Sequence, residues 1–423
     1  MSLLLQNIKL IGDNIPWLQD LRQKGSGAYT KAGIPTPKTE AWKYTKPSRF
    51  FVDDFVVKPQ GAEKARQIKY DLPFDAYQIC FENGVLQSID SELPEGVVIL
   101  PIIETIMFHH DYRTKIGTLV NLDYHPFAAL NTACLNEGVC VEILPQAKLD
   151  KPIIFIYHTT ADSEKVLYNM RNLIIVNSQA KAEMVEWFCY DGAPKSAYFN
   201  NIVNEIYLED QAVLYHYKVQ NEAFKAAHIA LNSVKAAADS FYKSFCLQKG
   251  ADLGRNETKV VLAARGASAQ VDGAYMMNGW ATLDTTTDIE HLVCHTTSNQ
   301  LVKGVVGGQA KGVFQGKIHI APNAVKTEGY QLHKALVLTD EAEVDVKPEL
   351  EIFADDVKCS HGSACGQLDP EQLFYMRSRG ISEAEAKQLL IDAYLEECLA
   401  KVDNEKIKAW IKSFLTTQTE ISL

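Results

Sequence analysis

The side chains best suited to bind a metal lie in the run KCSHGSAC, residues 358–365. Cys359 and His361 are two residues apart, so a β-strand would place both on one face. A thiolate and an imidazole are both acceptable ligands for iron. Two ligands are too few for a stable site, so a metal bound here needs further ligands from elsewhere in the chain or from another protein. The alternative interpretation is a buried thiol and a core histidine at the end of a strand.

Other histidines and cysteines give weaker signals. Residues 290–295, EHLVCH, also carry imidazole and thiol groups. His109 and His110 are adjacent and would point in different directions, so we interpret them, together with His125, as surface or hydrogen-bonded histidines. The nine cysteines are dispersed, and no two form a CxxC pair. The sequence therefore indicates neither a disulfide framework nor a zinc site or resident cluster held by neighbouring thiolates.

The common catalytic motifs are missing from the sequence. The run GVFQGKI, residues 312–318, lacks the spacing of a Walker A loop and the hydroxyl that follows its lysine, so we expect no ATP hydrolysis. A serine nucleophile elbow and an HExxH zinc motif are also missing. An enzyme acting on polysaccharide would need carboxylates grouped on one strand face, whereas the Asp and Glu residues here are scattered. We therefore expect a protein that is not an enzyme.

The candidate ligands follow a long region of short β-rich segments, which runs from about Val139 to Val357. Each segment is rich in β-branched and aromatic residues and too short for a helix. The clearest are residues 153–157, 173–176, 184–188, 213–217, 241–245 and 312–320. This region must position Cys359 and His361.

Alanines recur just before many of these segments, at intervals of about 30 residues, with a break between Ala269 and Ala310. They are Ala182, Ala212, Ala238, Ala269, Ala310 and Ala342. A period near 30 with several strands is what a parallel β-solenoid needs, since its turns stack about 4.8 Å apart and its corners favour small residues. An antiparallel sandwich or barrel also gives short strands at short intervals. The pattern alone leaves both architectures open.

Helices are predicted on both sides of the strand region. Asn14 can cap an N-terminal helix that has Pro16 in its first turn, and residues 127–131 also look helical. The run ENGV, residues 82–85, indicates a hairpin turn. Residues 33–45, GIPTPKTEAWKYT, hold charges and aromatic rings between prolines, and we interpret them as a packed connector.

The C-terminal segment predicts three helices. Asp369 can cap the first, and Ser382 with Glu385 forms a capping box for the second. The third has an apolar face made by Ile407, Trp410, Ile411 and Phe414. These faces could cover the end of the strand stack or dock a partner.

Composition narrows the classes of function. The chain has 423 residues, 47% of them hydrophobic and 22% charged, as in an ordinary folded protein. Its formal net charge of −11 argues against sequence-independent nucleic-acid binding. No apolar run is long enough to span a membrane, and the first residues lack the pattern of a secretory signal. We therefore expect a cytoplasmic protein that binds neither nucleic acid nor membranes.

Several blocks of the sequence together resemble the SufB/SufD family of iron–sulfur cluster assembly scaffold proteins. They are residues 33–45, 286–291, 296–300, 314–318, 350–352, 355–362, 366–369 and 373–381. The first block and the length of the chain favour the SufD branch, because members of the SufB branch are usually longer and often carry an N-terminal CxxC motif.

The resemblance implies a right-handed parallel β-helix core flanked by helical regions. The implied domains are an N-terminal helical or mixed region at 1–100, the core at 101–368 and a C-terminal helical domain at 369–423. It also implies a scaffold that is not itself an ATPase, that forms a heterodimer with SufB and that binds the ATPase SufC through its C-terminal helices. His361 matches the histidine proposed for the family's cluster site, and Cys359 lies beside it.

In this picture a nascent iron–sulfur cluster is held transiently between this chain and SufB, which would supply the remaining ligands. The alternative is a purely structural partner of SufB and SufC that contributes no side chain to the chemistry. The sequence does not indicate the cluster type, whether a reduced flavin serves the complex, or whether the chain forms homodimers in isolation.

Overall fold

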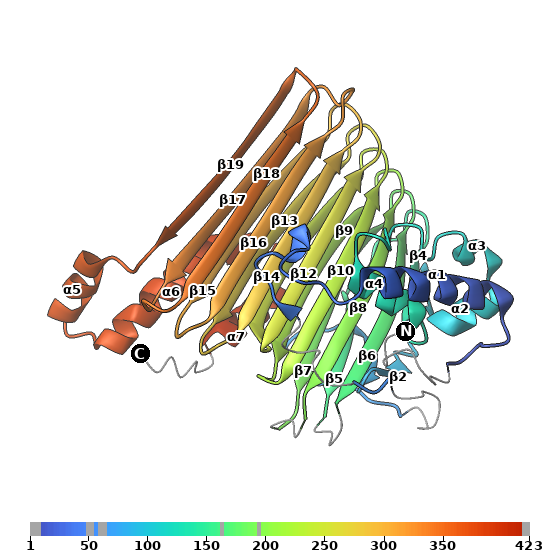
Figure 1. Ribbon diagram of the computed structural model, residues 1–423, viewed down its shortest axis with the longest axis horizontal. Coiled ribbons are helices and arrows are strands. Elements are labelled where there is room, and N and C mark those ends of the chain that lie inside the picture. The colour runs from blue at the N-terminus through green and yellow to red at the C-terminus, as the bar shows by residue number, and fades with distance from the viewer. Residues whose placement is uncertain (1–9, 48–54, 58–65, 161–164, 193–195, 417–423) are drawn as a thin grey trace.

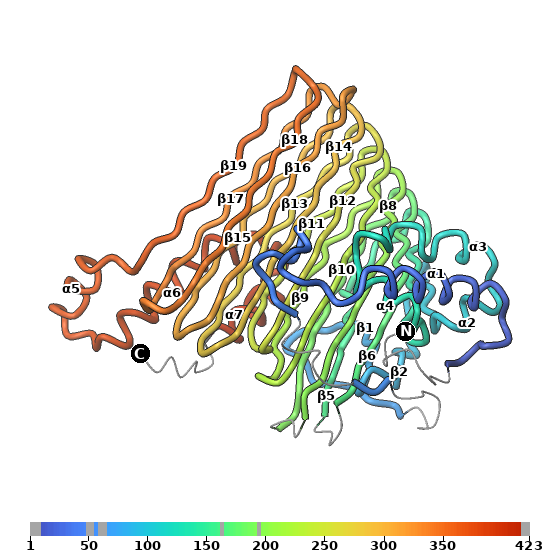
Figure 2. The backbone as a smooth tube through the Cα atoms, in the orientation of Figure 1, coloured from blue at the N-terminus to red at the C-terminus, as the bar shows by residue number. Residues whose placement is uncertain are grey.

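The chain forms a parallel β-helix with helices at both ends (Figure 1). The computed structural model describes residues 10–47, 55–57, 66–160, 165–192 and 196–416. From the fourth strand onwards, successive strands alternate between two sheets, so the backbone coils along one axis (Figure 2). This architecture confirms the predicted β-helix core with flanking helices.

The first sheet has ten strands and the second has nine. The ten-stranded sheet contains β1 (Tyr77–Glu82), β2 (Val85–Ile89), β5 (Ile153–Thr159), β7 (Lys181–Tyr190), β9 (Val213–Glu222), β11 (Phe241–Gly250), β13 (Ser268–Met277), β15 (Thr297–Val306), β17 (Thr327–Val337) and β19 (Val357–Gly366). The nine-stranded sheet contains β3 (Val97–Pro101), β4 (Val139–Ile143), β6 (Val166–Val176), β8 (Tyr198–Leu208), β10 (Ala226–Ala236), β12 (Leu253–Leu262), β14 (Thr282–His291), β16 (Lys311–Ile320) and β18 (Glu343–Ile352). Every strand segment predicted from the sequence lies within one of these strands.

One turn of the solenoid takes about 30 residues, as the alanine spacing predicted. Val213 pairs with Phe241, and Phe241 pairs with Ser268, at steps of 28 and 27 residues. These pairs are parallel, so the antiparallel sandwich or barrel is excluded. The break in the alanine series is a change of sheet, because Ala269 lies in β13 of the ten-stranded sheet and Ala310 precedes β16 of the nine-stranded sheet.

A residue with positive φ forms one corner of many turns. Gln179, Gln211 and Lys326 have φ angles of 62°, 59° and 59°. The backbone N–H of each donates to a carbonyl in the next turn of the solenoid. The residues that follow the first two, Ala180 and Ala212, are buried, as expected where turns stack closely. Glutamine and lysine carry no local signal for positive φ, so the sequence located these corners only to within a few residues.

The N-terminal region packs against the early turns of the solenoid. Its helices are α1 (Pro16–Ala32), the 3₁₀-helix η2 (Glu40–Trp42), α2 (Ile102–Phe108), α3 (His110–Arg113) and α4 (Pro126–Ala133). The predicted cap at Asn14 is wrong, because Ile15 holds that position and makes no side-chain capping bond. The predicted hairpin turn is confirmed by the antiparallel pairing of β1 with β2, with positive φ at Asn83 and Gly84.

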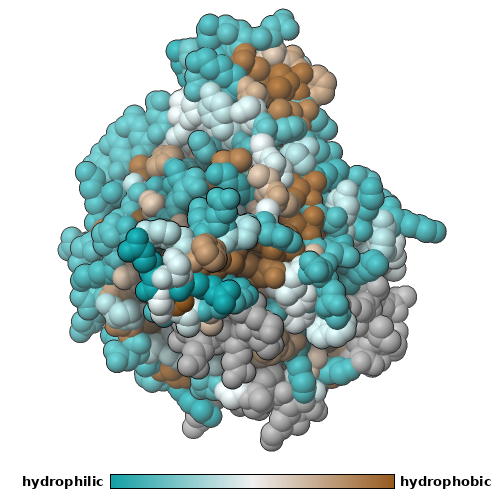
Figure 3. Space-filling model, turned by 90° about the vertical axis from the view of Figure 1, so that its left-hand side faces the viewer, coloured by the Kyte–Doolittle hydropathy of each residue, from teal (hydrophilic) through white to brown (hydrophobic). Residues whose placement is uncertain are grey.

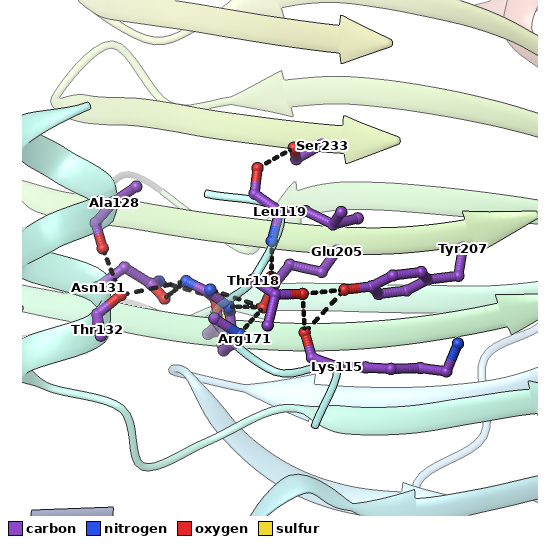
Figure 4. A network of polar contacts seen from close by, with 12 residues as sticks. Lys115, Thr118, Leu119, Ala128, Asn131, Thr132, Arg171, Glu205, Tyr207 and Ser233 are labelled. Carbon is purple, nitrogen blue, oxygen red and sulfur yellow. Dashed lines mark hydrogen bonds and ion pairs between the residues drawn. The ribbon is translucent and has the colours of Figure 1, made fainter. Parts of the chain in front are cut away.

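A buried polar network fastens a loop of this region to the nine-stranded sheet (Figure 4). Arg171 Nη2 lies 2.7 Å from Glu205 Oε1, and both side chains are about 1% exposed. The Glu205 carboxylate also accepts hydrogen bonds from the backbone N–H groups of Gly117 and Leu119. The charges of this ion pair are thus compensated inside the protein, and the loop is held against the sheet.

Residues 33–45 cross the outer face of the same sheet, as the packed-connector interpretation predicted. The guanidinium carbon of Arg255 lies 4.2 Å from the centre of the Trp42 ring, a cation–π contact. The Thr45 hydroxyl donates to Asp284, to which Arg255 also donates. The segment therefore links the start of the chain to β12 and β14.

The C-terminal helices are α5 (Pro370–Ser378), α6 (Glu383–Leu399) and α7 (Glu405–Thr416). Both predicted caps are confirmed, since Asp369 accepts from the N–H of Glu371 and Ser382 from that of Glu385. Helix α6 packs on the outer face of β13 and β15. No helix in the described part of the chain is long and apolar enough to cross a membrane.

The predicted domain limits at 1–100, 101–368 and 369–423 stay a prediction. Strands β1 and β2, which lie within residues 1–100, and β3, which crosses that limit, already belong to the two sheets of the solenoid.

Candidate functional site

Cys359 and His361 lie in β19, the last strand of the ten-stranded sheet. This strand pairs with β17 on one side and has no strand on the other among the described residues. Figure 1 shows β19 as the outermost strand at one end of the solenoid. The backbone groups along its outer edge are thus available to an additional strand.

The register shows which way the two side chains face. Cys359 pairs with Gly329 and His361 with Gln331, and these two residues of β17 are buried. The Cys359 sulfur lies 3.3 Å from the point that a Cβ on Gly329 would occupy, close to Ile318 of the opposite sheet. Residues that pair on neighbouring parallel strands share a face of the sheet. Cys359 and His361 therefore point from β19 towards the interior of the solenoid. The prediction that both share one face is confirmed.

The interior is open at this end of the solenoid, so Cys359 and His361 are more exposed than the residues that pair with them on β17. His361 is exposed and Cys359 is partly exposed, whereas Gln331, one turn deeper, is 3% exposed. His361 has no hydrogen-bond or ion-pair partner within the described part of the chain. Its imidazole is therefore able to bind a group from outside the chain.

Cys365 lies on the same inward-pointing face of β19, and the sequence analysis did not predict it as a ligand. It lies an even number of residues from both Cys359 and His361, and it pairs with Ala335 of β17, which is buried. Strand alternation could have found it. Burial raises the pKa of both the Cys359 and the Cys365 thiol, so both are mainly protonated at neutral pH. A metal or a nearby base must remove the proton before either sulfur can act as a thiolate ligand.

The opposite side of this open end is apolar. In β18, Val344, Val346 and Leu350 pack towards the interior. At the corner that follows, Ile352 and Phe353 are 41% and 60% exposed. Figure 3 views the molecule from this end and shows hydrophobic patches among polar residues. Exposed apolar surface next to unpaired strand edges is typical of a surface that another chain covers.

The described residues contain no group of three His, Cys, Asp or Glu side chains placed to hold a metal ion.

Two other histidines singled out from the sequence, His291 and His125, form polar contacts inside the protein. His291 is buried and lies 2.8 Å from the Thr296 hydroxyl through Nδ1 and 2.9 Å from the Ser298 hydroxyl through Nε2. Burial lowers its pKa to about 4, so it is neutral. The Nδ1 of His125 lies 3.0 Å from the Glu257 carboxylate. The interpretation of His125 as a satisfied histidine is thus confirmed.

Comparison with known proteins identifies the family. Residues 158–394 match the model "SUF system FeS cluster assembly, SufBD core domain", and residues 1–155 match "SufBD protein N-terminal region".

Curated relatives agree with this match. "Iron-sulfur cluster assembly protein SufD" of Escherichia coli is 28% identical over 89% of this chain and 88% of its own length. The protein of the same name from Bacillus subtilis is 27% identical over 94% and 93%. "Protein ABCI7, chloroplastic" of Arabidopsis thaliana is 32% identical over 92% and 84%. A solenoid with its candidate ligands at an open end thus coincides with sequence similarity over nearly the whole chain, and this chain belongs to the SufBD family of iron–sulfur cluster assembly proteins.

Proposed function

We propose that this chain is a scaffold subunit of the SUF machinery, without ATPase or other catalytic activity, and that a nascent iron–sulfur cluster forms where it meets SufB. His361 and Cys359 would contribute ligands from this side. The cluster is cargo that the site holds transiently and then passes on. The observation that carries this proposal is the position of both residues in one inward-facing row at the open end of the solenoid.

The free edge of β19 supports pairing with a second chain. An additional strand can bond to this edge through the backbone alone. The last strand of the other sheet, β18, is less suited to this role because Pro348 has no N–H to donate. We therefore place the SufB strand beside β19, where it would close the interior over His361.

The number of ligands supports a shared site. A cluster needs more ligands than the imidazole and the neighbouring thiol, and soft thiolates are its usual ligands. The described residues supply no third ligand in a suitable position. In this proposal SufB supplies the missing ligands, and the site exists only in the complex.

The C-terminal helices support docking of the ATPase SufC. Helix α5 has no buried residue, and Phe374 and Tyr375 in it are 75% and 60% exposed. Aromatic side chains of this kind are common anchors at protein interfaces. Because the helices follow β19 directly, movement of a partner bound to them could be transmitted to the open end. We place this assembly in the cytoplasm.

The experiment is to replace His361 by alanine in the complex with SufB and SufC and to measure iron and sulfide per complex. Loss of the cluster from an intact complex is the expected result. His319→Ala is the matched control, since His319 is partly exposed on the outer face of β16 and contacts Glu351. An intact complex that still forms a full cluster without His361 would contradict the proposal and favour a purely structural role.

A further inference from the structure

Gln331 lies one turn deeper than His361 in the same inward-facing row. The two residues are direct partners in the register of β17 and β19. Neighbouring parallel strands are about 4.8 Å apart, so their side chains stack on each other. Gln331 therefore forms the inner wall of the opening in which His361 lies.

The amide of Gln331 is buried and unused. The residue is 3% exposed, and neither its Oε1 nor its Nε2 has a hydrogen-bond partner among the described residues. Buried amides are nearly always hydrogen-bonded, because an unpaired one has lost its water without gaining a partner. A side chain that only filled space here would be more stable as an apolar residue.

The opposite sheet leaves space for this amide. A Cβ on Gly316 of β16 would lie 1.6 Å from Gln331 Nε2, so any larger residue at that position would displace the amide. Gly316 belongs to the block at residues 314–318 that resembles the family. Its absent side chain explains how a glutamine can occupy the interior at this level.

The neighbours of Gln331 along the interior each make a hydrogen bond through one of their two polar atoms. Gln300 precedes it by one turn in the same row and accepts a hydrogen bond from the Thr287 hydroxyl at 2.6 Å. His333, two residues further along β17, has its Nε2 at 2.8 Å from the Tyr275 hydroxyl. Gln331 differs from both because neither polar atom of its amide is hydrogen-bonded within the described part of the chain, and it is the residue that pairs with His361 in the register.

We propose that Gln331 is a positioning residue for the candidate cluster site: its Oε1 accepts a hydrogen bond from the Nδ1–H of His361. A histidine that binds a metal through one ring nitrogen usually donates its other N–H to a carbonyl or carboxylate, which fixes the tautomer and the orientation of the ring. With its proton held on Nδ1, the imidazole presents the Nε2 lone pair to the iron at the open end. This inference rests on the proposed function.

Three variants in the complex with SufB and SufC test the inference. Gln331→Met removes the amide but keeps the length of the side chain, and Gln331→Glu keeps an acceptor at the same place. Gln300→Met is the matched control, because it removes an equally buried amide one turn further from His361. Size-exclusion chromatography establishes that each complex is intact, and iron and sulfide analysis gives its cluster content.

The decisive readout is pulsed electron paramagnetic resonance of the reduced cluster, which detects the ring nitrogen of a bound histidine that is remote from the metal. The quadrupole coupling of this nitrogen depends on the hydrogen bond made by its N–H. We expect Gln331→Met to change the coupling and to weaken binding of the cluster about tenfold, as is usual for loss of such a supporting hydrogen bond, so that the cluster content falls. Gln331→Glu should retain the cluster but shift the coupling, because a carboxylate is a stronger acceptor.

A coupling that is unchanged in both Gln331 variants would overturn the inference, as would equal effects of Gln300→Met and Gln331→Met. The proposed function fails in a different way: the wild-type complex would show no histidine nitrogen, or the nitrogen signal would persist in His361→Ala. If Gln331→Met does not assemble, the shift expected in Gln331→Glu decides the question alone.

Discussion

His361 is exposed because of the strand in which it lies. Gln331, Gln300 and Val271 precede it in the same row of the ten-stranded sheet, and all three are buried. This stack of inward-facing residues becomes exposed only in β19, the last strand of the sheet. A polar side chain that would be structural one turn deeper is therefore available at this position for binding.

A second residue at this scale controls stability rather than binding. Burial raises the pKa of Glu137 to about 7, and its carboxylate accepts one hydrogen bond, from the Leu86 N–H. The unfolded chain would titrate this group near the ordinary value of about 4.3. The folded state thus holds the extra proton between these two values.

We predict that Glu137→Gln removes a pH dependence of stability. Because the folded pKa is raised, the stability contributed by the protonated carboxyl is present below about pH 4.3 and is lost as the pH rises through about 7, by up to roughly 1.4 kcal/mol per pH unit. Urea unfolding at several pH values should show the variant gaining stability over the wild type from pH 5 to 7. Parallel pH profiles of the two proteins would contradict this prediction.

At the scale of elements, the corners of the solenoid depend on backbone geometry. Gly250 and Gly279 both have positive φ, 76° and 73°. A Cβ on Gly250 would lie 1.9 Å from the Glu222 carbonyl oxygen of the turn beside it, whereas a Cβ on Gly279 would meet nothing within 4 Å. The two glycines have similar φ angles and differ in the space around them.

This pair gives a matched test of how closely the turns stack. Gly279→Ala should cost about 1 kcal/mol, the penalty of a left-handed conformation alone. Gly250→Ala should cost about 3 kcal/mol or more, because the backbone of the adjacent turn must also move. Chemical denaturation measures both differences. Equal losses would mean that the corner at Gly250 is looser than the structure indicates.

The elements also show how far the sequence could be interpreted. The caps at Asp369 and Ser382 were predictable because each is a local hydrogen bond encoded by adjacent residues. Strand alternation likewise predicted that Cys359 and His361 share a face. It could not tell whether that face is inside or outside, since this depends on which strands stack on it. The partner of His361 in the register, Gln331, was out of reach because it is set by the number of residues in one whole turn.

At the scale of the molecule, the two ends of the solenoid are formed by different kinds of elements. At the N-terminal end, the antiparallel strands β2 and β3 terminate the two sheets, and α1 and α4 pack on the early turns. At the other end, β18 and β19 end the sheets, and the interior row is exposed. Stacked-repeat proteins require their terminal repeats to be covered. Helices of this chain pack beside the first turns, and we propose that SufB covers the open end.

Hydrogen–deuterium exchange of the backbone amides of β19, measured with and without SufB, tests most directly whether SufB covers this open end. We predict strong protection of residues 357–366 when SufB is present and a smaller change in β18, whose edge is interrupted by Pro348. Exchange in β19 that is the same with and without a bound SufB would contradict this prediction, because the partner would then not cover the strand that carries His361.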